Sequence, residues 1–215
     1  MSSPAPPAAS TPRRPSWPLL AVILLAGVLL VHHGVSRADG PPQPDPGSAK
    51  LGTRTPPADP LPASAPVRVR IPQIGVDAPL TRVGRDKEGW LEAPPPEDAD
   101  LAGWFTGAVS PGERGTAVID GHVDNAAGPA VFYGLGSLKK GQHIEIDRAD
   151  GRTAVFEIHG IDVVDKTDFP DRRVYGGTGL PELRVITCGG SYNKRTGYAG
   201  NVVLYGLLTS VRDRA

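Results

Sequence analysis

Alternation of apolar and polar side chains dominates the chain from Val67 onward. The run VRVRIPQIGVDAPL, which starts at Val67, alternates apolar and charged residues as a half-buried strand does. Short β-branched runs bounded by Gly, Asp or Pro follow: GTAVIDGHVD, HIEIDR, TAVFEIHGIDVVDK, LRVITC and NVVLYGLL. Helix-like pieces are short, around PEDADLAGWF and AVFYGLGSL. We therefore expect a mainly β domain over residues 67–215, an all-β barrel or sandwich with one or two small helices.

A different pattern, uniformly apolar, occupies residues 17–31 with the sequence WPLLAVILLAGVLLV. This stretch is shorter than the roughly 20 residues of a membrane helix, but the following HHGV extends it, and we predict a transmembrane signal anchor over 17–35. Arg13 and Arg14 precede it, so residues 1–16, which are predicted to be disordered, would be cytoplasmic and the rest extracellular. A cleaved signal peptide is the alternative, because SRA at 36–38 is an acceptable cleavage site.

Composition separates the N-terminal third from the rest of the 215-residue chain. Fifteen of the 24 prolines precede Val67, and residues 36–66 contain few large apolar side chains, so we predict a Pro/Gly-rich linker there. The formal net charge is zero, which gives no sign of a nucleic-acid partner. The single cysteine excludes a disulfide framework and a multi-cysteine zinc site, and the acidic residues are scattered, so we expect no metal or other cofactor.

That cysteine, Cys188, is the first candidate for chemistry. It follows the apolar run LRVIT and precedes Gly189 and Gly190, which predicts a position at the end of a strand. A buried structural thiol is the alternative, since free cysteine is often buried. The next segment, SYNKRTGYAG, is polar and basic, and cationic neighbours favour a reactive thiolate.

A nucleophilic cysteine needs a partner base, and His122 is the best placed of the five histidines. It follows the strand-like TAVIDG as Cys188 follows LRVIT, so we expect the two to meet at one rim of a barrel. Asp120 and Asp124 flank His122 and are candidates to orient its ring or to form turns.

Acyl transfer by a thiolate also needs hydrogen-bond donors for the tetrahedral oxyanion. The candidates are backbone N–H groups near Gly189 and Gly190 and one of two arginines. Arg195 lies in the segment after Cys188, and Arg184 lies four residues before it, on the same face of a regular strand.

Together these residues resemble a known family. VITCGG is similar to the cysteine-bearing strand end of sortases, membrane-anchored cysteine transpeptidases of Gram-positive bacteria, and VIDGHVD is similar to their histidine segment. The longer segments around both motifs look most like the actinobacterial class F. The resemblance covers about residues 67–215 and implies an eight-stranded sortase β-barrel with short helices.

The resemblance also implies a catalytic set of histidine, cysteine and arginine. His122 and Cys188 match it directly. In many sortases the arginine lies just before the final strand, where this chain has Ala199, Gly200 and Asn201, so Arg195 is chosen as the nearest arginine and Arg184 as the fallback. Thr187, beside the thiol, is a further candidate donor to the substrate or an ordinary strand residue.

The implied reaction is a transpeptidation through a thioester. Its partners would be proteins with an LPxTG-like sorting signal and an amine acceptor, from a peptidoglycan precursor or a pilin lysine. Two alternatives stay open: a hydrolytic cysteine peptidase with the same residues, and a non-catalytic, membrane-tethered module that binds the cell wall.

Overall fold

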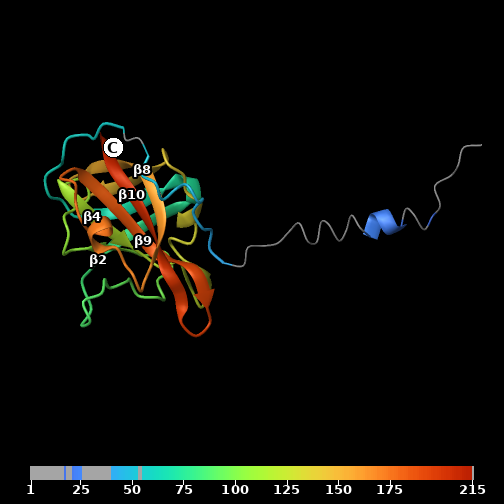
Figure 1. The fold of residues 1–215 in the computed structure, drawn as a ribbon. Coiled ribbons are helices and arrows are strands. Elements are labelled where there is room, and N and C mark those ends of the chain that lie inside the picture. Colours follow the sequence, from blue (N-terminus) through green and yellow to red (C-terminus); the bar gives the residue numbers. More distant parts are fainter. Residues whose placement is uncertain (1–16, 18–20, 26–39, 53–54, 215) are drawn as a thin grey trace, which may run out of the picture. The chain divides into compact units, whose positions relative to one another are not determined.

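The structure, a computed structural model, describes residues 17, 21–25, 40–52 and 55–214. Eight strands close into a barrel in the order β1-β2-β3-β4-β9-β10-β8-β7 (Figure 1). Their bounds are β1 Pro66–Ile71, β2 Val76–Val83, β3 Ala102–Phe105, β4 Gly115–Asp120, β7 His143–Arg148, β8 Arg152–Asp165, β9 Pro181–Asn193 and β10 Gly197–Asp213. This confirms the predicted mainly β fold with an eight-stranded barrel.

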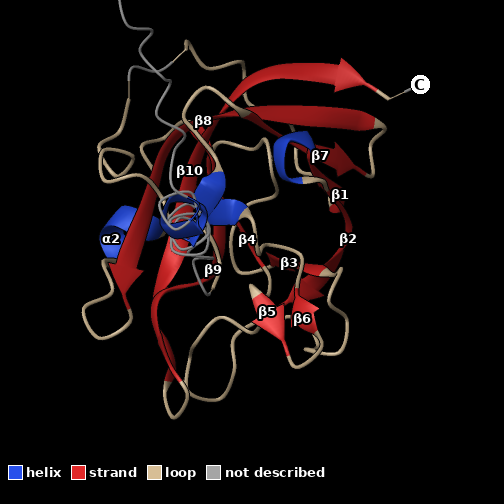
Figure 2. Cartoon of the chain, turned by 90° about the vertical axis from the view of Figure 1, so that its right-hand side faces the viewer, coloured by secondary structure: helices blue, strands red, loops and turns tan. Residues whose placement is uncertain are grey.

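Smaller elements connect the barrel strands. They are the 3-10 turns η1 Pro72–Ile74 and η2 Leu135–Ser137, the short helix α2 Asp171–Val174, and the two-stranded sheet of β5 Asp124–Asn125 and β6 Gly128–Pro129. Figure 2 shows β5 and β6 beside the lower part of the barrel. Most neighbouring strands are antiparallel, but β2–β3 and β4–β9 are parallel. The β4–β9 pair matters most, because it joins the predicted histidine segment to the predicted cysteine segment.

The two faces of β9 lie in different environments, as the two-residue period of a strand requires. Leu183 and Val185 belong to the large cluster contributed by all the barrel strands, which fills the barrel interior. Ile186 belongs to a second apolar cluster on the opposite face, here called the outer cluster. The buried members of the outer cluster are Val83, Phe105, Val118, Val164, Val174, Ile186, Val203 and Tyr205.

Some local predictions were wrong. The segment 96–105 was expected to be helix-like, but its last four residues form β3, which pairs in parallel with β2 and antiparallel with β4. The segment 130–138, the other helix-like piece, does contain a short helix, the 3-10 helix η2. The long run from Val67 is divided by η1, where Pro72 begins the turn and Gly75 ends it with a φ of 69°.

The described part of the predicted linker is packed on the barrel. Backbone hydrogen bonds join Gly52 to His159, Ala58 to Leu208 and Leu61 to Gly112, and Ser48 is buried. Polar, proline-rich sequence does not predict such packing, because the bonds use main-chain groups that carry no sequence signal.

The predicted anchor over 17–35 lies largely outside the described residues. Trp17 and residues 21–25 are described as helical. Within the described part of the chain, no helix is both long and apolar enough to cross a bilayer.

Candidate active site

Cys188 lies within β9 and not at its end. The strand continues through Gly189 and Gly190 to Asn193, and forms with the start of β10 a hairpin that extends below the barrel in Figure 1. Cys188 is directly opposite Asn201 of β10 and is half-buried. The thiol is free and on the same face as Ile186, so its surroundings are the edge of the outer cluster.

His122 is brought to Cys188 by the parallel pairing of β4 with β9. The register pairs Gly115 with Pro181 and Asp120 with Ile186, a constant offset of 66 residues. Two contacts extend the pairing past the end of β4. The Gly121 amide donates to the Ile186 carbonyl at 3.2 Å, and the Thr187 hydroxyl donates to the Gly121 carbonyl at 2.8 Å. Continued by one more residue, the same offset would set the backbone of His122 beside that of Cys188, at roughly the strand spacing of 4.8 Å.

The His122 ring is held by the loop between β2 and β3. Its Nε2 lies 2.7 Å from the carbonyl oxygen of Pro94. A carbonyl only accepts, so Nε2–H is the donor and Nδ1 is the nitrogen left to exchange a proton. The backbone is fixed as well, because the Phe132 amide donates to the His122 carbonyl at 3.0 Å.

The two aspartates that flank His122 were candidates to orient its ring, and the structure shows a different contact for Asp124 and a buried carboxyl for Asp120. Asp124 accepts a hydrogen bond from the hydroxyl of Tyr198, and burial together with this bond raises the pKa of that tyrosine. The bond ties the β9–β10 hairpin to β5. Asp120 is buried beside Gly103, and burial raises the pKa of its carboxyl to about 7.

Replacing Asp120 with asparagine is expected to change how stability depends on pH. The pKa of an aspartate carboxyl is ordinarily 3.8, and in the fold the pKa of Asp120 is about 7, so the folded state binds the extra proton between these values. Wild-type stability should therefore fall as pH rises from about 4 to 7, by up to about 4 kcal/mol, and Asp120→Asn should remove that fall. Urea unfolding at pH 5 and pH 8 measures it, with exposed Asp100→Asn as the control. If the free energy of unfolding depends on pH equally in Asp120→Asn and Asp100→Asn, the prediction is contradicted.

Lys166 is a functional candidate that the sequence reasoning missed. Its Nζ lies 3.6 Å from Cys188 Sγ. The residue follows directly after the end of β8, and β10 lies between β8 and β9 in the sheet. Nothing near Lys166 in the sequence signals this contact, because it depends on the register of two separate strand pairs.

The two predicted arginines lie elsewhere. Arg195 is exposed in the turn of the β9–β10 hairpin, beyond Asn193 and seven residues along the chain from Cys188. Arg184 is buried, ion-paired with Glu182 at 3.3 Å, and stacked over the Tyr205 ring with 4.7 Å to its centroid. Both partners lie toward the start of β9, away from the thiol.

Thr187, which was predicted to donate a hydrogen bond to the substrate, is buried and faces away from the sulfur. Residues 187 and 188 point to opposite faces of β9, and the Thr187 hydroxyl is engaged with Gly121. This hydrogen bond joins β9 to Gly121, the residue that precedes His122.

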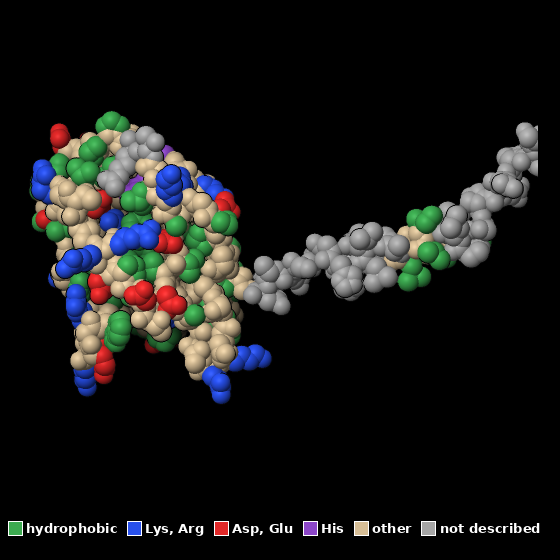
Figure 3. Space-filling model, viewed as in Figure 1, with side chains coloured by type: hydrophobic (Ala, Val, Ile, Leu, Met, Phe, Trp, Pro, Cys, Tyr) green, Lys and Arg blue, Asp and Glu red, His purple; other side chains and the backbone are tan. Residues whose placement is uncertain are grey.

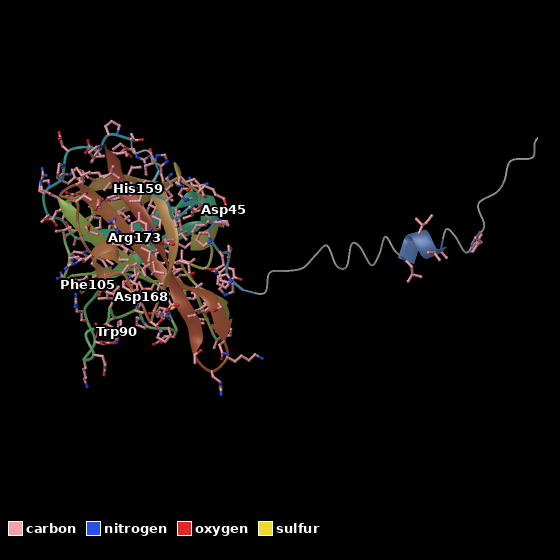
Figure 4. The ribbon with its side chains drawn as sticks, viewed as in Figure 1. Asp45, Trp90, Phe105, His159, Asp168 and Arg173 are labelled. Atoms are coloured by element: carbon pink, nitrogen blue, oxygen red, sulfur yellow. The ribbon has the colours of Figure 1, made fainter. Side chains whose placement is uncertain are left out.

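A cavity of about 480 Å³ lies next to the His122 contact. It is lined by the end of β2 and the following loop, and Pro94 belongs both to its wall and to the contact with the His122 ring. Figure 3 shows the surface hollowed between two projections at its lower edge. Figure 4 labels Phe105, Asp168 and Arg173 on the barrel and Trp90 on the loop that projects below it.

The barrel therefore has a free cysteine on β9 and a histidine just after the end of the neighbouring strand β4, the two side-chain types that thiol-dependent acyl transfer uses. The comparisons with known proteins agree. The family model described as Sortase domain matches residues 69–209, and the chain therefore belongs to the sortase family.

Solved structures with the same fold include several sortases. Sortase A of Listeria monocytogenes is 18% identical, with a TM-score of 0.52, over 72% of this chain and 92% of that one. SrtA of Actinomyces oris is 18% identical, with a TM-score of 0.53, over 78% and 89%. Sortase C-1 of Actinomyces oris is 22% identical, with a TM-score of 0.51, over 67% and 73%. The search of curated proteins finds no match.

Proposed function

We propose that this chain is a cysteine transpeptidase that cuts a sorting signal and joins the released protein to an amine. The observation that supports the proposal is the β4–β9 register within a sortase-family barrel, because the same offset continued past Asp120 would bring His122 beside Cys188. The free thiol supplies a nucleophile, and the imidazole supplies the proton transfers that making and breaking an amide require.

The proposed reaction has two halves. The Cys188 thiolate attacks the scissile carbonyl, and a tetrahedral oxyanion forms. As it collapses, the C–N bond breaks, the leaving amine takes a proton from His122, and a thioester remains on Sγ. An acceptor amine then attacks the thioester and gives a proton to His122, the C–S bond breaks, and the thiolate returns.

The substrate and the location are proposals that rest on the sequence. We propose an LPxTG-like sorting signal as donor and a peptidoglycan precursor or a pilin lysine as acceptor, with the class F sortases as the subgroup. The cavity beside Pro94 supports a peptide-binding role, because a segment bound there would lie next to the His122 ring. A membrane anchor in the N-terminal segment would hold the catalytic domain outside the cell.

A peptide assay tests the proposed reaction. The enzyme is incubated with an LPxTG-like peptide, with and without a short amine such as triglycine, and products are separated by mass spectrometry. Transfer predicts that the amine adduct replaces most of the free acid. Free acid formed equally in both reactions would favour the hydrolytic peptidase and contradict transpeptidation.

A further inference from the structure

The fold holds Lys166 over the thiol through three neighbouring strands. Cys188 of β9 is opposite Asn201 of β10, and Asn201 is opposite Val164 of β8, so these three share one face. Lys166 is two residues beyond Val164 and keeps that face by strand periodicity. Its backbone amide donates to the Ala199 carbonyl at 3.1 Å, which continues the β8–β10 pairing past Asp165.

Gly200 permits the close approach of these strands. A Cβ added there would lie 2.6 Å from the Val164 carbonyl oxygen, a distance that side chains do not tolerate. With glycine at this position, the end of β8 packs tightly against β10, and the lysine side chain spans the remaining distance to the sulfur.

Lys166 donates a hydrogen bond to Sγ, and three nearby arginines have contacts elsewhere or lie in a turn. Arg184 is engaged with Glu182 and Tyr205, Arg195 is in the hairpin turn, and Arg173 is ion-paired with Asp162 at 2.6 Å. Lys166 is exposed, so its ammonium also reaches the solvent side from which a peptide would approach.

We propose that Lys166 is a catalytic residue whose ammonium first holds the Cys188 thiolate and then donates a hydrogen bond to the oxyanion that forms on attack. The proposal rests on the proposed acyl transfer. The lysine keeps its proton throughout, and the proton transfers stay with His122. An ammonium has three donors on a flexible stem, so one can follow the negative charge from sulfur to the carbonyl oxygen, which forms one bond away.

The first test measures the charge beside the sulfur without any peptide substrate. Cys188 is alkylated with iodoacetate, an anion, and with the neutral iodoacetamide, and the ratio of the two rates is compared between variants. In Lys166→Met the iodoacetate-to-iodoacetamide ratio should fall by roughly fivefold at low salt, and high salt should shrink the difference. Lys166→Arg should keep the wild-type ratio, as should Lys50→Met, which removes an exposed lysine elsewhere.

The second test measures the chemistry. Lys166→Met should lower kcat for transfer on the order of 100-fold with little change in KM, as removal of an oxyanion donor does. Lys166→Arg should recover the rate to within about tenfold. Lys166→Gln serves as a second neutral variant, and thermal melting checks that each variant is folded.

The outcomes separate this proposal from the proposed function. An unchanged alkylation ratio in both neutral variants would overturn the role of Lys166 while leaving transfer intact. If Arg195→Ala loses peptide transfer while Lys166→Met transfers at the normal rate, the oxyanion donor is Arg195, the arginine predicted from sequence, and not Lys166. A substrate adduct on Lys166 that survives hydroxylamine would also overturn it, because the amine would then be an acceptor. A lowered ratio in a protein that transfers no peptide would confirm the ion contact and refute the proposed function.

Discussion

Replacing Cys188 with alanine is expected to abolish both cleavage and transfer of a sorting-signal peptide. The sulfur is the only thiol in the chain, and the hydroxyl of the adjacent Thr187 cannot take its place, because it is buried on the opposite face of β9. The rate should fall by roughly 10⁴-fold or more, as it does when an enzyme loses its nucleophile.

The measurement combines product formation with intact-protein mass. Wild-type enzyme incubated with peptide and no amine should carry the mass of the acyl group, and Cys188→Ala should not. Ser191→Ala, an exposed change on the same strand, is the matched control and should behave as wild type. Transfer that persists in Cys188→Ala would show that the thiol is not the catalyst, whereas a wild-type enzyme that neither cleaves nor transfers the peptide would favour the non-catalytic wall-binding module.

Sequence pattern predicted the strands well where burial alternates. The segments HIEIDR and TAVFEIHGIDVVDK become β7 and most of β8, because their apolar positions face the barrel interior at every second residue up to Ile158, after which a register shift makes Ile161 the next interior position. The pattern failed at Ala102–Phe105, where all four residues are buried and no alternation exists to read. That strand is specified by its partners β2 and β4, which the local sequence does not reveal.

The proximity of His122 to Cys188 stays a prediction, which rests on their equivalent places after apolar runs and on the parallel pairing of β4 with β9 up to Asp120 and Ile186. The exact position of the cysteine was not predictable. Two glycines after an apolar run indicate a strand end, but β9 continues because β10 pairs with it as far as Asn193. This extension carries Arg195 away from the thiol and into the turn.

The cation beside the thiol was predictable only from tertiary structure. Lys166 and Cys188 are 22 residues apart, and Lys166 follows β8, a strand that does not pair with β9, the strand of Cys188. Their contact depends on β10, which pairs with both strands, so that two registers together decide which β8 residue reaches the sulfur. The roles of Arg195 and Arg184 stay predictions until their variants are measured.

Replacing His122 with asparagine is expected to lower the rate of amide cleavage by roughly 10² to 10⁴-fold. The reason is specific to proton transfer, since Nε2–H is held by Pro94 and Nδ1 is the nitrogen available to the leaving amine. An aryl ester leaves as an anion and needs no proton, so His122→Asn should slow an aryl-ester substrate far less than the matching amide. His143→Asn, on β7, is the control and should leave both rates unchanged. An equal loss on amide and ester would show that the imidazole acts on the thiol or on the fold and does not protonate the leaving group.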